Sequence, residues 1–205
     1  KDLRKYRIEY SSGPWSIKYG DIYEVWGRGL VLAQLDDQGI DFDNSSRGYL
    51  INYQSDNISV TQMSGETVNA QLGADLRHPE FEFTHNIDAT NINFEAYPFS
   101  YGLSFLQSNE LHQLKPLGVM DTVDINHRLH GAYISWFGSN MDIFIEYMDK
   151  QSKSRTFQTN FSGQEIESLA PLKRGSAAYF NSNYYLGNWS LFFEYKRYSF
   201  DRLNP

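Results

Sequence analysis

The sequence lacks cysteine, long apolar runs and any excess of positive charge. Without cysteine, neither a disulfide framework nor a thiolate metal site can form. No run of about 18 apolar residues occurs, which excludes a membrane-spanning helix. The net charge of −7 argues against a nucleic-acid partner, because nucleic-acid binding needs a basic surface. None of these absences excludes a membrane protein built from β-strands, which turn only every second side chain towards lipid.

Aromatic residues, by contrast, make up 16% of the chain, and many of them alternate with polar residues. Trp15, Ile17 and Tyr19, for example, alternate with Ser16 and Lys18. A period of two is typical of β-strands with one apolar face. Similar segments recur along the chain. They predict about ten strands of about ten residues, a length that spans a bilayer when the strand is tilted.

Short turns and long loops join the predicted strands in strict alternation. Short turns are expected at Gly13, Asp56, Tyr97, Asn140 and Gly187. Long polar loops are expected to begin near Leu30 and to cover Ser64–Thr90, Asn109–His127 and Gln151–Lys173. In an antiparallel meander, this alternation puts the short turns at one end and the long loops at the other, as in bacterial outer-membrane barrels.

Three tryptophans lie near the predicted short turns. Trp15 and Trp189 directly follow such a turn, and Trp136 lies just before one. Aromatic residues gathered at one level are typical of a membrane-interface girdle. We therefore predict an all-β fold: an antiparallel up-and-down meander that forms a transmembrane outer-membrane β-barrel. Residues 1–205 are expected to form a single barrel domain or part of a larger barrel.

The charged residues of the predicted strands indicate which face is the lumen. Those on the face opposite the apolar row are Arg7, Glu9, Lys18, Glu146, Glu194 and Lys196. A Lys or Arg that faces mid-bilayer lipid costs about 2–4 kcal/mol, so this face is expected to line the lumen. The residues expected to face lipid are Tyr133, Phe137, Ile143, Ile145, Phe180, Leu191 and Phe193.

The alternation fails between about residues 20 and 46, where acids, glycines and two arginines are concentrated. We predict a turn-rich or briefly helical insert that folds against the barrel interior; the alternative is a strand with a glycine bulge at Gly20. Because a guanidinium binds carboxylates bidentately, the acids are expected to collect around Arg28 and Arg47. The expected lumen ion-pair network consists of Asp21, Glu24, Arg28, Asp41, Asp43, Asn44 and Arg47.

Two motifs of this region resemble sequences of one group of proteins. They are Gly20-Asp21-x-Tyr23-Glu24-x-x-Gly27-Arg28-Gly29-Leu30 and Ile40-Asp41-x-Asp43-Asn44-Ser45-x-Arg47-Gly48. Together with the segment from Asn188 to Lys196, they resemble uncharacterised outer-membrane barrel proteins of the Bacteroidetes. The resemblance implies an outer-membrane location and a barrel fold, and it implies no activity. Members of that group are longer, so the chain is expected to be part of a bigger barrel.

The sequence shows no catalytic, cofactor or metal signature. His130 and Ser135 have opposite parity on one predicted strand and therefore point to opposite faces, which argues against a hydrolytic pair. Asp41, Asp43 and Asn44 offer oxygen ligands, but the regular spacing and the closing glutamate of a calcium loop are missing. We therefore expect no catalysis, no cofactor and no metal.

Two functions from different classes fit these patterns. The first is an outer-membrane barrel that acts as a pore or as a structural scaffold within a cell-envelope assembly. Its partners would be outer-membrane lipid and other envelope proteins. The second is a soluble antiparallel β-sheet protein that binds glycans through surface aromatics. The apolar row discriminates between them, since it faces outwards on a barrel and forms the core of a soluble protein.

Overall fold

The structure is a computed structural model that describes residues 5–37, 42–71, 81–114, 121–159 and 164–200. Its strands are β1 (Arg7–Ser12), β2 (Trp15–Ile22), β3 (Asp36–Asp37), β4 (Phe42–Asp43), β5 (Ser46–Gln54), β6 (Ile58–Gln71), β7 (Phe81–Ala96), β8 (Phe99–Leu114), β9 (Asp121–Phe137), β10 (Met141–Thr159), β11 (Glu165–Leu169), β12 (Lys173–Leu186) and β13 (Trp189–Phe200). Within the described part of the chain, no helix is long and apolar enough to cross a membrane.

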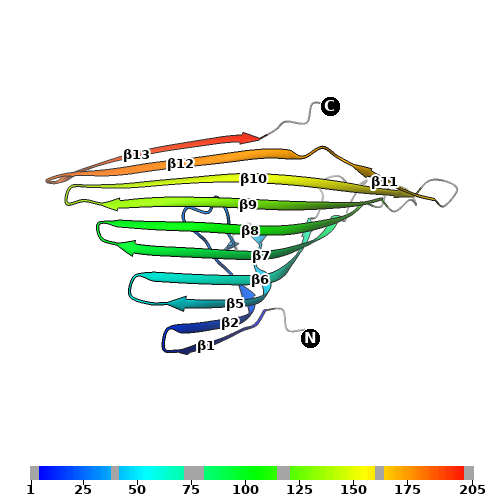
Figure 1. Cartoon of the computed structure of the whole chain (residues 1–205), viewed down its shortest axis with the longest axis horizontal. Coiled ribbons are helices and arrows are strands. Elements are labelled where there is room, and N and C mark those ends of the chain that lie inside the picture. The colour runs from blue at the N-terminus through cyan, green and yellow to red at the C-terminus, as the bar shows by residue number, and fades with distance from the viewer. Residues whose placement is uncertain (1–4, 38–41, 72–80, 115–120, 160–163, 201–205) are drawn as a thin grey trace.

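One large antiparallel sheet contains all of these strands except β3 and β4, which form a small pair of their own (Figure 1). Its order is β1-β2-β5-β6-β7-β8-β9-β10-β12-β13, with β11 paired to β10 beside β12. Each strand therefore lies next to its neighbour in the sequence. The predicted all-β fold and its antiparallel up-and-down meander are confirmed. The two outermost strands, β1 and β13, do not pair with each other, so the sheet is not closed.

Short turns join the strands at one end of the sheet, on the left in Figure 1. Gly13 and Gly187 form two of these turns, and both have a φ of 56°. This is the left-handed region that glycine enters without steric cost. The strand ends joined by the longer connections, between β2 and β5, β6 and β7, β8 and β9, and β10 and β12, all lie at the opposite end. The predicted separation of short turns from long connections is therefore correct.

The strands are longer than the alternation predicted, and the segments expected as long loops are in large part strand. The reason is visible on β10. Beyond Met148, Asp149 and Gln151 point to one face while Lys150 and Ser152 point to the other, and all four remain paired with β9. Both faces are polar in this part of the sheet. The alternation of hydrophobicity therefore disappears although the hydrogen-bonded ladder continues.

The two faces of the sheet differ strongly in exposure. On β8, Tyr101, Leu103 and Phe105 are 40–48% exposed, whereas the alternate residues Ser104 and Leu106 are buried. We call the face that carries these exposed aromatics the outer face, and the opposite one the inner face. Of the residues expected to face lipid, those that lie on the outer face are Ile143, Ile145, Phe180, Leu191 and Phe193.

Tyr133 and Phe137 were assigned to the wrong face. Tyr133 is paired with Glu146 in the β9–β10 register. Its ring stacks on Phe144 at 5.4 Å, and its hydroxyl donates to Asn93 at 3.0 Å, both on the inner face. The sequence alternation could not show which residues of this segment face outwards, because both the odd-numbered and the even-numbered residues are apolar at this end of β9. The outward row is Ala132, Ile134 and Trp136.

Residues 23–45 connect β2 to β5, and the part of this segment from Trp26 to Leu32 lies over the inner face. Trp26, Val31 and Leu32 are buried and belong to one apolar cluster with residues of the sheet. The sheet residues of that cluster are Ile22, Leu50, Met63, Ile87, Ala89, Leu106, Leu129, Met148 and Ala177. Val31 fills the space that the missing side chain of Gly131 leaves on β9. The core of the protein is therefore the contact between this connecting segment and the inner face.

Candidate functional site

The segment of residues 23–45, which we call the insert, begins with a tight hairpin. The chain leaves the sheet after Ile22 and returns to it at Ser46. Between these points Val25 bridges to Ala33 in antiparallel orientation. The insert is therefore held by backbone hydrogen bonds of its own before it contacts the sheet.

The tip of the hairpin depends on two glycines. The amide of Trp26 donates to the carbonyl of Leu32 at 3.0 Å, and the amide of Gly29 donates to the carbonyl of Trp26 at 2.8 Å. Gly27 and Gly29 have φ values of 58° and 82°, where side chains are strained. The described residues of the insert form turns, the bridge between Val25 and Ala33 and the short strand pair β3–β4, and they contain no helix.

The hairpin tip docks on a buried carboxylate of the sheet, Glu146 of β10. Glu146 is 3% exposed, and its Oε2 accepts the amide of Arg28 at 2.7 Å. The amide of Leu30 also donates to this carboxylate. A Cβ at Gly27 would lie 2.8 Å from the carboxylate, so only glycine allows this close approach. Glu146 therefore acts as an anchor for the insert.

The guanidinium of Arg28 lies over two aromatic rings of the inner face. It is 5.3 Å from the ring centre of Phe144 and 5.9 Å from that of Tyr179. Among the described side chains, no ion pair involves this guanidinium; the basic residues of the neighbouring ion pairs are Lys18, Arg47 and Lys196. The expected collection of acids around Arg28 is therefore wrong. The cation is satisfied by aromatic faces, and the nearby acid Glu146 is occupied by backbone amides.

Asp21 and Arg47 form an ion pair, but the register of β2 and β5 places them on the side of the exposed Tyr19 and Tyr49 and not on the inner face. Arg47 Nε lies 3.1 Å from Asp21 Oδ1, across the β2–β5 pairing. Asp21 is 6% exposed, and its second oxygen accepts the amide of Tyr6 at 2.6 Å. The Arg47 guanidinium also lies 5.4 Å from the centre of the Tyr6 ring. Asp21 therefore ties the residues before β1 to the end of the sheet.

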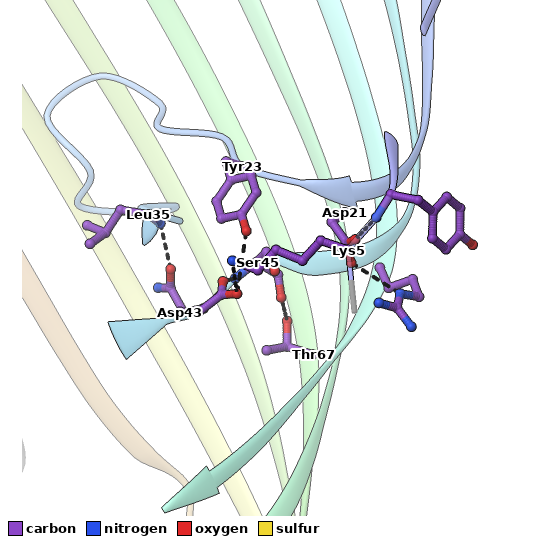
Figure 2. A network of polar contacts seen from close by, with 10 residues as sticks. Lys5, Asp21, Tyr23, Leu35, Asp43, Ser45 and Thr67 are labelled. Carbon is purple, nitrogen blue, oxygen red and sulfur yellow. Dashed lines mark hydrogen bonds and ion pairs between the residues drawn. The ribbon is translucent and has the colours of Figure 1, made fainter. Parts of the chain in front are cut away.

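Asp43 lies in a second cluster, shown in Figure 2. Lys5 Nζ lies 2.8 Å from Asp43 Oδ2, and the Tyr23 hydroxyl donates to the same oxygen at 3.4 Å. The amide of Ser45 donates to Oδ1 at 2.9 Å. Partial burial acts to raise the pKa of Asp43, but the hydrogen bonds from Lys5 and Ser45 outweigh burial and leave this pKa below its ordinary value.

The remaining predicted site residues have separate partners. Glu24 pairs with Lys18 at 2.9 Å. Asn44 accepts the amide of Leu35 at 2.6 Å and donates to the carbonyl of Ala33 at 2.8 Å, so it closes the insert on itself. Asp41 lies outside the described residues. Asp21, Glu24 and Asp43 thus have three different basic partners, Arg47, Lys18 and Lys5, and they do not share one central arginine.

A line of uncharged polar groups joins the insert to β5 and β6. Gln34 donates to the Ser46 hydroxyl at 2.5 Å, and the Ser46 and Thr67 hydroxyls lie 2.9 Å apart. The Thr67 hydroxyl also donates to the Ser45 carbonyl at 2.7 Å. Gln34 Oε1 is buried and has no hydrogen-bond partner among the described residues. These contacts fix the end of the insert where the chain re-enters the sheet.

Two cavities border residues 31–34 and 43–45 of the insert. One of about 420 Å³ is bordered by Lys5, Asp21, Asp43, Arg47 and Glu66, so both charge signs line it. The other, of about 190 Å³, lies between the insert and the inner faces of β7 to β10. A cavity of this second size accommodates a few water molecules. A third cavity, of about 380 Å³, borders Gly27 and Arg28 at the hairpin tip. Space therefore remains on several sides of the insert.

His127 lies on the inner face beside the smaller cavity and has partners on both ring nitrogens. Its Nδ1 is 2.7 Å from the Ser152 hydroxyl, and its Nε2 is 3.3 Å from Glu110 Oε1. Glu110 also lies 3.8 Å from His85 Nε2. These residues come from four neighbouring strands. As the parity argument predicts, His130 lies on the opposite, outer face.

The sequence alone did not reveal several of these partners. Lys5 and Lys18 lie outside the segment in which basic residues were sought, and Glu146 is far away in the chain. The sequence does hold a clue to the role of Glu146. It is a charged residue on the predicted lumen face of a strand, and a glycine-rich insert was expected to fold against that face. Among the described residues, no group of three or more His, Cys, Asp or Glu side chains is arranged to hold a metal ion.

Two solved structures resemble the fold of this protein. One is OmpT of Vibrio cholerae, an outer-membrane protein folded in vitro and described in its trimer form; it shares 8% identity at a TM-score of 0.63. The other is OmpT of Vibrio cholerae expressed in the outer membrane, with 8% identity and a TM-score of 0.60. The alignments cover 96% and 95% of this chain, but only 54% and 53% of those chains. At this identity the likeness shows the fold alone.

The chain thus spans about half the length of the outer-membrane barrels that it matches in structure. Among curated proteins, no sequence matches it. A family model, however, matches nearly the whole sequence, from residue 1 to residue 202. The chain therefore belongs to the family of unknown function DUF6029.

Proposed function

We propose that this protein is a transmembrane β-barrel of the bacterial outer membrane and acts as a constricted pore, narrowed by the insert. In this proposal its surroundings are outer-membrane lipid and other proteins of the cell envelope. Its role is not catalytic. The likeness to outer-membrane proteins of the same meander fold supports this proposal at the level of the fold.

The main support for this proposal comes from the exposed apolar residues of the outer face. On β8 the apolar row from Phe99 to Phe105 covers about 20 Å along the strand, at 3.4 Å per residue. This is close to the apolar band of outer-membrane barrels, which is roughly 25 Å tall. Exposed aromatics such as Trp15 and Trp189 lie at the short-turn end of the band. In a soluble protein this row would form the core, whereas here the core is on the other face.

The surroundings of His127 favour a role without catalysis. Ser152, His127 and Glu110 form a hydrogen-bonded chain. However, each of these residues lies within a strand that is paired on both sides. The neighbouring backbone amides are engaged in the ladders and do not converge on a common point, as the donors that stabilise an oxyanion must. We interpret the chain of contacts as a way to satisfy polar groups of the inner wall.

Conductance across planar lipid bilayers tests the proposed pore. The full chain is expected to give small, stable current steps. Replacing residues 24–34 by a short glycine-serine linker removes the hairpin and is expected to raise the conductance severalfold. Glu146→Ala, which removes the anchor and leaves the hairpin in the chain, is expected to give fluctuating currents of increased size.

The outcomes separate the pore from its alternatives. Protein that inserts into bilayers but gives no current, with or without the hairpin, would point to a structural scaffold. Protein that stays in solution without detergent would contradict the membrane barrel itself and favour the soluble glycan-binding alternative. Circular dichroism of each variant checks that the sheet has formed before its current is interpreted.

A further inference from the structure

The apolar band of the outer face ends at the same level on the neighbouring strands β9 and β10. Tyr147, which is 52% exposed, is paired with Ala132, and both are apolar. The next outward pair is Asp149 and His130. The change from apolar to polar residues therefore follows one line across the sheet. In the proposed barrel, this line marks the membrane surface on the side of the long connections.

Three cations surround Gln151 directly beyond this line. In the registers of β9, β10 and β12, Gln151 is paired with Arg128 on one side and with Arg174 on the other. Lys153 is the next outward residue on β10, so it is a diagonal neighbour of Arg128, about 7–8 Å away. This spacing suits the oxygens of a phosphate group, which two or more basic side chains can contact together.

The charges of these cations are only partly balanced nearby. Among the described side chains, no ion pair involves Arg128 or Lys153, whereas Arg155 lies 3.9 Å from Glu167. Asp124, which is paired with Arg155 in the register, adds a second counter-charge at that position. Asp149, the outward residue before Gln151 on β10, supplies one acid on the other side. The cluster of Arg128, Lys153 and Arg174 still carries an excess of positive charge next to the apolar band.

The same cations border a groove that also has apolar walls. The groove has a volume of about 520 Å³. It is lined by three basic residues, Arg128, Lys153 and Arg155, by the polar residues Asp124, Asn126 and Gln151, and by Leu169 and Leu172. The two leucines are 67% and 40% exposed. A groove with cations, an amide and exposed leucines at the edge of a lipid-facing band matches a molecule with a charged head and apolar chains.

We infer that this groove binds the phosphate-bearing headgroup of an anionic lipid in the membrane leaflet on the side of the long connections. Arg128 and Lys153 contact the phosphate, Gln151 donates to it from between them, and Leu169 and Leu172 contact the first part of an acyl chain. This inference rests on the proposed membrane barrel. Beyond that barrel, it names the class of lipid that binds and the position of the binding site on the outer face of the sheet.

Native mass spectrometry of the full chain in neutral detergent tests the inference. Lipid A with both phosphates is titrated into the protein, and bound lipid is counted. The double variant Arg128→Gln with Lys153→Gln is expected to bind it at least about tenfold more weakly, because charge-assisted hydrogen bonds are lost. Lys150→Gln is the matched control: it removes one charge from the same strand on the inner face, and it is expected to bind like the unchanged protein.

Two further arms identify the ligand. Dephosphorylated lipid A is expected to bind no better to the unchanged protein than to the double variant. Inorganic phosphate alone is expected not to displace the lipid; displacement would indicate a site for free phosphate and overturn the inference. Equal binding of both lipids, or equal binding by the double variant, would also overturn it. Protein that inserts into membranes but shows either result would leave the proposed barrel intact, whereas protein that never enters a membrane would contradict both.

Discussion

At the scale of single residues, the contact between Gly27 and Glu146 fixes the position of the insert. Glu146 lies on the inner face, on the side opposite the exposed apolar row as the sequence predicted, but its burial and its backbone donors were not foreseen. By sequence pattern alone, Glu146 is one of several charges expected to face the lumen. In the structure it is a buried anchor, because the glycine tip of a distant hairpin brings two amides to it.

Gly27→Ala tests this contact. Gly27 has a φ of 58°, so any side chain is strained there by about 1–2 kcal/mol. An added Cβ would also lie 2.8 Å from the Glu146 carboxylate. The matched control is Gly13→Ala, since Gly13 has a φ of 56° and nothing within 4 Å of its Cβ position. Urea unfolding in detergent is expected to show a larger loss of unfolding free energy for Gly27→Ala than for Gly13→Ala. Equal losses of unfolding free energy would mean that the contact with Glu146 contributes nothing to stability.

A second residue-scale prediction compares two ion pairs. Asp21 is 6% exposed and accepts hydrogen bonds from Tyr6 and Arg47. Asp21→Ala is expected to lower the free energy of unfolding by about 1–3 kcal/mol, the usual range for hydrogen bonds to a charged group. Glu9→Ala, at the exposed pair with Arg7, is expected to change it by less than about 1 kcal/mol. Thermal unfolding that ranks the two variants in the reverse order would contradict the role given to Asp21.

The revised position of Arg28 leads to a third prediction. A central arginine surrounded by acids would have cost about 3–5 kcal/mol on removal. The structure instead places its guanidinium over Phe144 and Tyr179. Arg28→Ala is therefore expected to cost about 1 kcal/mol, the size of a cation–π contact with some exposure. If urea unfolding shows that Arg28→Ala lowers the free energy of unfolding by several kcal/mol, the ion-pair network around Arg28 would be supported after all.

At the scale of elements, the sequence predicted the strands and turns where one face of the sheet is apolar. Phe99 to Phe105 alternates cleanly, and the turns at Gly13 and Gly187 were found because glycine marks them. The strand ends beyond the apolar band were missed, since both faces of Asp149–Ser154 are polar. The path of the insert could not be predicted either. Its direction depends on Val31 over Gly131 and on the Glu146 anchor, which are contacts between distant parts of the chain.

The outward row of β10 gives a prediction at this scale. Ile145 is 44% exposed on the outer face within the apolar band. Ile145→Arg is expected to reduce the amount of folded protein in the outer membrane, because a mid-bilayer arginine costs about 2–4 kcal/mol. Leu111→Arg is the control, since Leu111 is 37% exposed on the outer face of β8 but lies beyond the band. Membrane fractions with equal amounts of both variants would contradict the position of the band.

At the scale of the whole molecule, the account depends on the two faces of one sheet. The inner face carries the insert, Glu146 and the buried apolar cluster, while the outer face carries exposed aromatics. The sheet does not close between β1 and β13 within the described residues. The outer-membrane barrels that it resembles are about twice as long as the aligned region. The lipid-facing outer face is therefore the central claim, and it can be tested at single positions.

Fluorescence quenching in lipid vesicles tests this claim most directly. The chain has no cysteine, so Ile145→Cys on the outer face and Ser104→Cys on the inner face each provide one labelling site for an environment-sensitive dye. The account predicts that nitroxide-labelled lipid quenches the dye at position 145 and that soluble iodide does not. At position 104, lipid nitroxide is expected to have little effect. Equal quenching at both positions by lipid, or quenching at position 145 by iodide alone, would contradict the account.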